Sequence, residues 1–137
     1  SGAIERYRRR LSGPLLDRID LHVNVPAQRW SEWASVSTGE KSETIQRRVV
    51  EARRLQMERT GACNARILDS ALDATLNLTP DAEDLLRQAV DRWGLSARAT
   101  RKLQRVARTI ADLGARPRVD LDDMSEALSY RQDTGPE

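Results

Sequence analysis

The sequence predicts an all-α protein in which a small helical bundle follows one strand and an extended N-terminal segment. Two observations lead to this prediction. Apolar residues recur with helical spacing in four stretches after residue 42, and capping residues and glycines mark where these stretches begin and end. Strict alternation of apolar and polar residues, the pattern of a strand, is found between residues 19 and 25.

The composition is that of one compact domain with a charged, helix-rich surface. The chain has 137 residues, of which 39% are hydrophobic and 32% charged, and its net charge is +2. No apolar run approaches the ~20 residues that a membrane-spanning helix requires, and no signal-peptide pattern is visible. We therefore expect a cytoplasmic protein without a membrane partner. Cys63 is the single cysteine, which excludes a disulfide within the chain.

The first predicted element is the strand from Ile19 to Val25, which Pro26 ends. A single strand cannot satisfy its own backbone groups, so its sheet must lie outside this sequence or be supplied by another chain. We therefore expect the residues before about Ser42 to be poorly packed. The opening Ser1-Gly2 resembles a cloning remnant, and we expect the chain to be the C-terminal piece of a longer protein.

The first of the four helical stretches follows a polar region, residues 27–42, that is predicted to be a linker. One helix is predicted from Glu43 to Arg59, with Ser42 as its N-cap and Gly61 after its end. A short helix is expected at residues 70–75.

The remaining helices have stronger start signals. One begins with Thr79 as N-cap and Pro80 in the first position, and it ends before Gly94. The next is capped by Ser96 and reaches Leu113. The last is capped by Asp120 and runs from Leu121 to about Tyr130. Residues 132–137 are polar and should form a flexible tail.

Arg18 is the first candidate functional residue. It lies in the stretch Leu11-Ser12-Gly13-Pro14-Leu15-Leu16-Asp17-Arg18-Ile19-Asp20-Leu21, between a Gly-Pro turn and the predicted strand. A guanidinium at that place projects from the end of a sheet and presents a rigid set of donors that matches phosphate oxygens. Spacing alone favours a simpler role, an ion pair with Asp17 or Asp20.

Arg98 is the second candidate, because it lies in the first turn of the helix that Ser96 caps. A helix N-terminus offers free amide donors and the positive end of the helix dipole, so that an arginine there adds to an anion site. The alternative is an ordinary solvated charge near Asp91, which spacing alone favours.

Two runs of residues resemble a known family. The sequence L-S-G-P-x-L-D-R-x-D-L is similar to the arginine-finger segment of the magnesium-chelatase-like AAA+ ATPases, in particular to that of their ComM (YifB) branch of competence-associated proteins. The run Gly94-Leu95-Ser96-x-Arg98-Ala99, together with Val106 to Leu113, resembles the sensor 2 region of the same family. The resemblance extends over roughly residues 7–131, apart from the linker.

The resemblance implies a division of the chain and a function for it. Residues 1–26 would be the C-terminal end of the AAA+ core, 27–42 a linker, 43–131 the helical lid and 132–137 the tail. Arg18 would reach the ATP of a neighbouring subunit in a ring, expected to be a hexamer, and Arg98 would sense the nucleotide's phosphates. The parent protein would use ATP and magnesium, and its work would be coupled to DNA processing, such as branch migration in natural transformation.

The sequence also limits what this chain does alone. No G-x-x-x-x-G-K-[ST] motif is present, so the chain lacks a phosphate-binding loop and is not expected to hydrolyse or hold ATP by itself. His22 is the single histidine and has no partner for a zinc site or a catalytic triad. We therefore assign no metal-ligating residue.

A helix-turn-helix module that binds nucleic acid is the alternative function. The two helices around Gly94-Leu95-Ser96 have that outline, and one face of the second helix carries basic residues. These are Arg98, Arg101, Lys102, Arg105 and Arg108. The acidic start of the preceding helix, at Asp81 to Asp84, argues against DNA binding. A protein-docking bundle that uses the tryptophans is a third and weaker alternative.

Overall fold

A computed structural model of the chain describes residues 13–16, 18–27, 29–31 and 39–131. The predicted tail at 132–137, Asp17 and the middle of the predicted linker lie outside the described residues. The described helices, in chain order, are α2 (Gly13–Leu16), α4 (Ser42–Thr60), α5 (Asp69–Thr75), α6 (Pro80–Trp93), α7 (Ala97–Leu113) and α8 (Leu121–Ser129).

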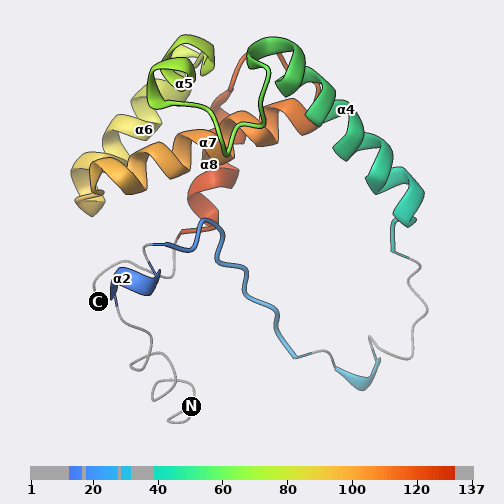
Figure 1. The fold of residues 1–137 in the computed structure, drawn as a ribbon. Coiled ribbons are helices and arrows are strands. Elements are labelled where there is room, and N and C mark those ends of the chain that lie inside the picture. Colours follow the sequence, from blue (N-terminus) through green and yellow to red (C-terminus); the bar gives the residue numbers. More distant parts are fainter. Residues whose placement is uncertain (1–12, 17, 28, 32–38, 132–137) are drawn as a thin grey trace.

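Helix α7 is the centre of the bundle (Figure 1). It packs against α8 on one side and against the end of α4 on another, and α8 in turn packs against α6. The all-α bundle that the sequence predicts is thus confirmed. None of the described helices is long and apolar enough to cross a lipid bilayer.

The predicted caps are present in three of the helices. The side chains of Thr79, Ser96 and Asp120 accept hydrogen bonds from backbone N–H groups in the first turns of α6, α7 and α8. Gly94 ends α6 in the left-handed conformation, with φ of 60°. The prediction for Ser42 is wrong, because α4 already includes Ser42 and is preceded by Lys41, which makes no capping hydrogen bond through its side chain.

The core is formed by small and branched apolar side chains from α5 to α8 and the loops between them. The largest of the core side chains that are wholly buried are Leu72, Leu103, Val119 and Met124. Alanines of α7 at positions 107 and 111 are also fully buried, which lets α8 approach closely. The bundle therefore closes around α7 without any phenylalanine.

Two charged residues of α7, Arg108 and Asp112, lie within this core. Each has a side chain that is 1% exposed, and their Nη2 and Oδ1 atoms are 3.1 Å apart. Arg108 also donates to the carbonyl oxygens of Leu76 (3.3 Å), Pro117 (3.1 Å) and Arg116 (2.7 Å). It thereby connects α7 to the end of α5 and to the loop before α8.

Asp112 connects the other side of α7 to α4. Arg59, at the end of α4, donates two hydrogen bonds to its carboxylate, at 2.9 and 2.7 Å. The side-chain amide of Asn64 donates to the same carboxylate at 2.9 Å, and the backbone N–H of Asn64 donates to Gln56 at 3.0 Å. A buried carboxylate with these partners is compensated in charge and in hydrogen bonds.

The predicted strand is not formed. Residues 21–27 have no regular secondary structure, and Val25 is 83% exposed. The one described backbone hydrogen bond of this stretch to the bundle is from the N–H of His22 to the carbonyl of Tyr130, at 2.9 Å. An alternating segment needs a neighbouring strand to form a ladder, and among the described residues there is none to pair with.

Less of the apolar face of helix α4 is buried than the helical spacing of its apolar residues predicts. Its second half contacts α7, with Ala52 and Gln56 buried, whereas Ile45 and Val49 in the first half remain exposed. Figure 1 shows why, because α4 extends away from the other helices toward its N-terminal end. The apolar stripe therefore continues beyond the surface that the described bundle covers.

Asp112→Ala should lower the free energy of unfolding by about 3–5 kcal/mol, because it leaves Arg108 buried without its counter-charge. Asp84→Ala is the control, since Asp84 is exposed on α6, and its effect should stay within about 0.5 kcal/mol. Urea unfolding followed by circular dichroism measures both. A loss of less than about 1 kcal/mol for Asp112→Ala would show that the pair is not a central support.

Asp120→Ala should lower the free energy of unfolding by about 1 kcal/mol at pH 7, because it removes the cap of α8. The N–H of Asp123, which donates to Asp120 at 2.9 Å, holds the pKa of the Asp120 carboxyl below its usual value. A carboxyl with a lowered folded-state pKa stabilises the fold above its unfolded-state pKa of about 3.9, and this contribution is lost as pH falls through the folded-state pKa.

The difference between the wild type and Asp120→Ala should therefore shrink at low pH. Urea unfolding at pH 7 and pH 3 makes the comparison, with Asp122→Ala, an exposed residue of the same turn, as the control. An equal difference at both pH values would contradict the assignment of the cap.

Candidate functional site

Arg98 lies in the first turn of α7, two residues after the N-cap Ser96. The Oγ of Ser96 accepts from the N–H of Ala99 at 3.1 Å, which fixes the start of the helix. The side chain of Arg98 is exposed. The positive end of the α7 dipole and a guanidinium are thus both at the surface at this point.

A basic cleft of about 610 Å³ adjoins this turn. Its charged lining residues are Arg98, Arg101, Lys102 and Arg105 from α7 and Asp69 from α5. Arg98 is the one among these cations that makes no ion pair or side-chain hydrogen bond with the described residues. Its charge is therefore available to a ligand in the cleft.

The other cations of the cleft have acidic partners. Arg101 forms a bidentate pair with Asp73, which holds the pKa of the Asp73 carboxyl below its usual value and raises that of Arg101. Arg105 donates to Asp69 at 2.7 Å and to the carbonyl oxygen of Asn64, also at 2.7 Å. These contacts fasten α7 to α5 and to the loop after α4.

Arg18 lies in the turn that follows α2, where its N–H donates to the carbonyl oxygen of Leu15 at 3.1 Å. Its side chain is exposed and makes no ion pair with the described residues. The simpler role, pairing with Asp20, is not observed, because Asp20 contacts Lys102 instead, at 2.9 Å. Asp17, the other partner that the sequence offered, lies outside the described residues.

The structure brings the segment of Arg18 to the helix of Arg98. Asp20, two residues after Arg18, is held by Lys102, which is one helical turn after Arg98 on α7. Sequence reasoning missed this contact, because nothing in the local pattern of either residue indicates a partner 82 positions away.

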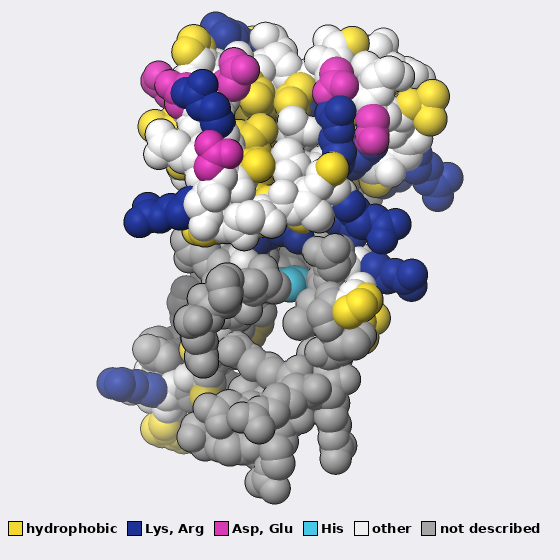
Figure 2. All heavy atoms as spheres, turned by 90° about the vertical axis from the view of Figure 1, so that its left-hand side faces the viewer, with side chains coloured by type: hydrophobic (Ala, Val, Ile, Leu, Met, Phe, Trp, Pro, Cys, Tyr) yellow, Lys and Arg dark blue, Asp and Glu magenta, His cyan; other side chains and the backbone are white. Residues whose placement is uncertain are grey.

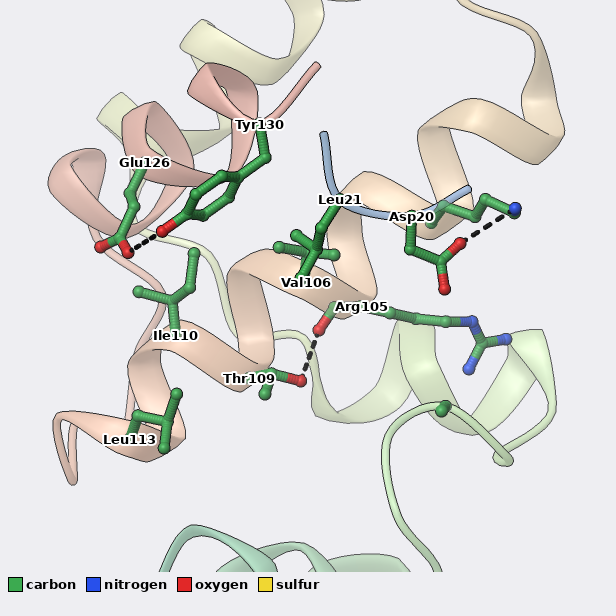
Figure 3. Close-up of a pocket in the computed structure, with 11 residues that line it drawn as sticks. Asp20, Leu21, Arg105, Val106, Thr109, Ile110, Leu113, Glu126 and Tyr130 are labelled. Carbon is green, nitrogen blue, oxygen red and sulfur yellow. Dashed lines mark hydrogen bonds and ion pairs between the residues drawn. The ribbon is translucent and has the colours of Figure 1, made fainter. Parts of the chain in front are cut away.

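A second cleft, of about 460 Å³, lies between α7 and α8 (Figure 3). Val106, Ile110 and Leu113 form its apolar wall on α7, and Leu21 of the N-terminal segment enters it. At one end, the hydroxyl of Tyr130 donates to Glu126 at 2.8 Å, and this hydrogen bond raises the pKa of the Tyr130 phenol.

The basic residues expected for a helix-turn-helix module do not form one continuous, unpaired face on α7. Arg108 is buried in the core, where burial lowers its pKa, and Arg101 and Arg105 are paired with aspartates. Figure 2 shows acidic and basic side chains interspersed over the face of the bundle that it views. A duplex needs a continuous basic surface, so this arrangement argues against that alternative.

Arg108 and Asp112 are the residues whose structural role the sequence analysis did not identify. A signal was present, because both positions fall within the apolar stripe of Leu103, Ala107 and Ala111. Opposite charges four residues apart on a buried face indicate an internal ion pair. No cluster of acidic, histidine or cysteine side chains suited to a metal ion occurs in the part of the chain described.

Comparisons with known proteins agree with this architecture. The profile of the magnesium chelatase subunit ChlI C-terminal domain matches residues 39–131, and that of magnesium chelatase subunit ChlI matches residues 1–33. The competence protein ComM of Haemophilus influenzae is 37% identical over 131 residues, which are 93% of this chain and 25% of that protein.

Two further relatives are similar to the same extent. The protein YifB of Salmonella typhimurium is 37% identical over 127 residues, which are 92% of this chain and 25% of the relative. A protein of Mycobacterium bovis is 36% identical over 131 residues, 93% of this chain and 26% of the relative. The chain thus spans about a quarter of the length of these relatives, and on the strength of both profiles and these identities it belongs to the magnesium chelatase ChlI family, with ComM and YifB among its relatives.

Proposed function

We propose that this chain is the helical lid, together with the last part of the core that precedes it, of a magnesium-chelatase-like AAA+ ATPase. In this proposal Arg98 is the sensor 2 arginine and Arg18 the arginine finger. The observation that supports this proposal most directly is that Arg98 is exposed and has no partner among the described residues. It lies at the start of α7 and lines the basic cleft.

The cleft fits the phosphates of a nucleotide. Arg98 adds donors to a helix N-terminus, and Lys102 and Arg105 line the same space. ATP held by the preceding core would supply the phosphoryl group that is transferred. Magnesium would be held by the preceding core. The described residues include no cluster of carboxylates suited to a metal ion.

Arg18 would act on a neighbouring copy. Its guanidinium is exposed in a turn and is unpaired among the described residues, as a group that reaches another subunit has to be. In a ring, expected to be a hexamer, it would donate to the phosphoryl oxygens of the adjacent site and stabilise the charge that develops there. Arg98 would hold the lid of its site in place while this occurs.

The name of one relative adds a biological setting. The protein of Haemophilus influenzae is called a competence protein. We extend this to the present chain as a proposal, in which ATP hydrolysis by the ring is coupled to DNA processing such as branch migration during natural transformation. The bundle itself contributes the arginines and the movement of the lid.

In the longer protein that carries this chain, Arg18→Ala should reduce steady-state ATP turnover about a thousandfold or more. Arg98→Ala should also reduce turnover, and in addition weaken nucleotide binding, because it removes a direct phosphate contact. Turnover, nucleotide affinity and ring assembly are measured on each variant. Arg87→Ala is the control, because Arg87 is an exposed arginine of α6 that pairs within its own helix.

DNA binding recorded on the same variants separates the two candidate functions. If turnover is unchanged and Arg98→Ala loses only salt-sensitive DNA binding, the helix-turn-helix alternative replaces the ATPase role. If Arg18→Ala retains turnover while rings still assemble, the assignment of the arginine finger is wrong.

A further inference from the structure

The N-terminal segment that carries Arg18 is fastened to the bundle at three successive residues. The carboxylate of Asp20 lies 2.9 Å from the Nζ of Lys102. Leu21 lines the cleft between α7 and α8, and about half of the residue remains exposed. The N–H of His22 donates to the carbonyl oxygen of Tyr130 at 2.9 Å. An ion pair, an apolar contact and a backbone hydrogen bond thus act together.

The three contacts belong to one site on the bundle. Figure 3 shows Leu21 beside Val106, and the neighbouring Asp20 is paired with Lys102. Val106 and Lys102 are four residues apart on α7, so they lie on the same face of the helix. Tyr130 follows the end of α8, on the other side of the cleft. The segment therefore lines the cleft with Asp20 and Leu21 and contacts the residue after α8 through His22, so that it is held at more than one point.

The ion pair between Asp20 and Lys102 lies close to both candidate arginines, Arg18 and Arg98. Arg18 is two residues from Asp20, a stretch that spans at most about 7 Å when extended. Arg98 is four residues from Lys102, about 6 Å along a helix axis. The ion pair between Asp20 and Lys102 therefore lies on a direct path that joins the turn of Arg18 to the N-terminus of α7.

We infer that Lys102 and the α7–α8 cleft form a docking site for residues 20–22, and that Lys102 positions Arg18 relative to the lid. The consequence for catalysis rests on the function proposed above. When the lid moves in response to its own nucleotide, it would move Arg18 as well, because the segment of Arg18 is attached to α7. Arg18 in turn acts on the nucleotide of the adjoining subunit. The docking itself depends only on contacts within this chain.

Hydrogen exchange and nuclear Overhauser effects on the chain test the docking directly. In the wild type, the Leu21 methyls should give cross-peaks to Val106, and the His22 amide should be protected. Lys102→Asp should speed exchange of the His22 amide about fivefold, the factor that corresponds to about 1 kcal/mol for one ion pair. Asp20→Lys with Lys102→Asp should restore the wild-type rate, because the pair is re-formed with reversed charges.

Arg87→Asp is the matched control, since it reverses an exposed arginine of α6 remote from the cleft lining. It should leave the His22 amide unchanged. Absence of the cross-peaks between Leu21 and Val106 in the wild type, or an exchange rate that the double variant fails to restore, would overturn the docking site.

The positioning role is tested by ATP turnover in the longer protein. Lys102→Asp should lower kcat several-fold, and the charge-swapped double variant should recover kcat. KM should rise in both variants, because each removes the Lys102 cation that lines the basic cleft. If docking is intact in the chain but kcat is insensitive to Lys102→Asp, while Arg18→Ala still abolishes turnover, the positioning role is wrong and the proposed function stands. If Arg18→Ala itself has no effect, the proposed function fails, and the exchange data still decide the docking.

Discussion

The buried ion pair between Arg108 and Asp112 is the interaction on which the rest of the bundle depends. Both side chains are withdrawn from water, so each must be compensated within the protein. Arg108 is compensated by carbonyl oxygens from the loops after α5 and before α8, and Asp112 by α4 and the loop that follows it. Because the partners come from four different segments, the pair specifies how all of them meet around α7.

Helix α7 consequently has two different halves. Its C-terminal half is fixed in the core by the buried pair and by alanines that allow close packing. Its N-terminal half carries a row of cations at the surface, of which Arg101 and Arg105 are held by aspartates and Arg98 is left free among the described residues. The same helix thus anchors the bundle and carries Arg98, the arginine proposed to contact phosphate. In the proposed function, a contact at Arg98 would therefore move the bundle as a whole.

The contacts of the N-terminal segment give this arrangement a mechanical consequence. Asp20, Leu21 and His22 are held along α7 and α8, so the turn of Arg18 is connected to the helix of Arg98 by side chains as well as by the chain itself. These contacts are a much shorter connection between Arg18 and Arg98 than the chain itself, which runs through the linker and α4. In the ring ATPase proposed above, such a connection would link the state of one nucleotide site to the arginine that acts on the next site.

The sequence by itself determined the features that depend on neighbouring residues. The caps at Thr79, Ser96 and Asp120, the left-handed Gly94 and the extents of the helices follow from hydrogen bonds within a few residues, and motif wording pointed to Arg18 and Arg98. The tertiary structure alone decided which arginine of α7 is buried, which are paired with aspartates of α5, and which has no partner among the described residues. Burial and pairing with α5 both depend on residues that are distant in sequence. The tertiary structure also decided that residues 19–25 form no strand, since a strand exists only with a neighbour to pair with.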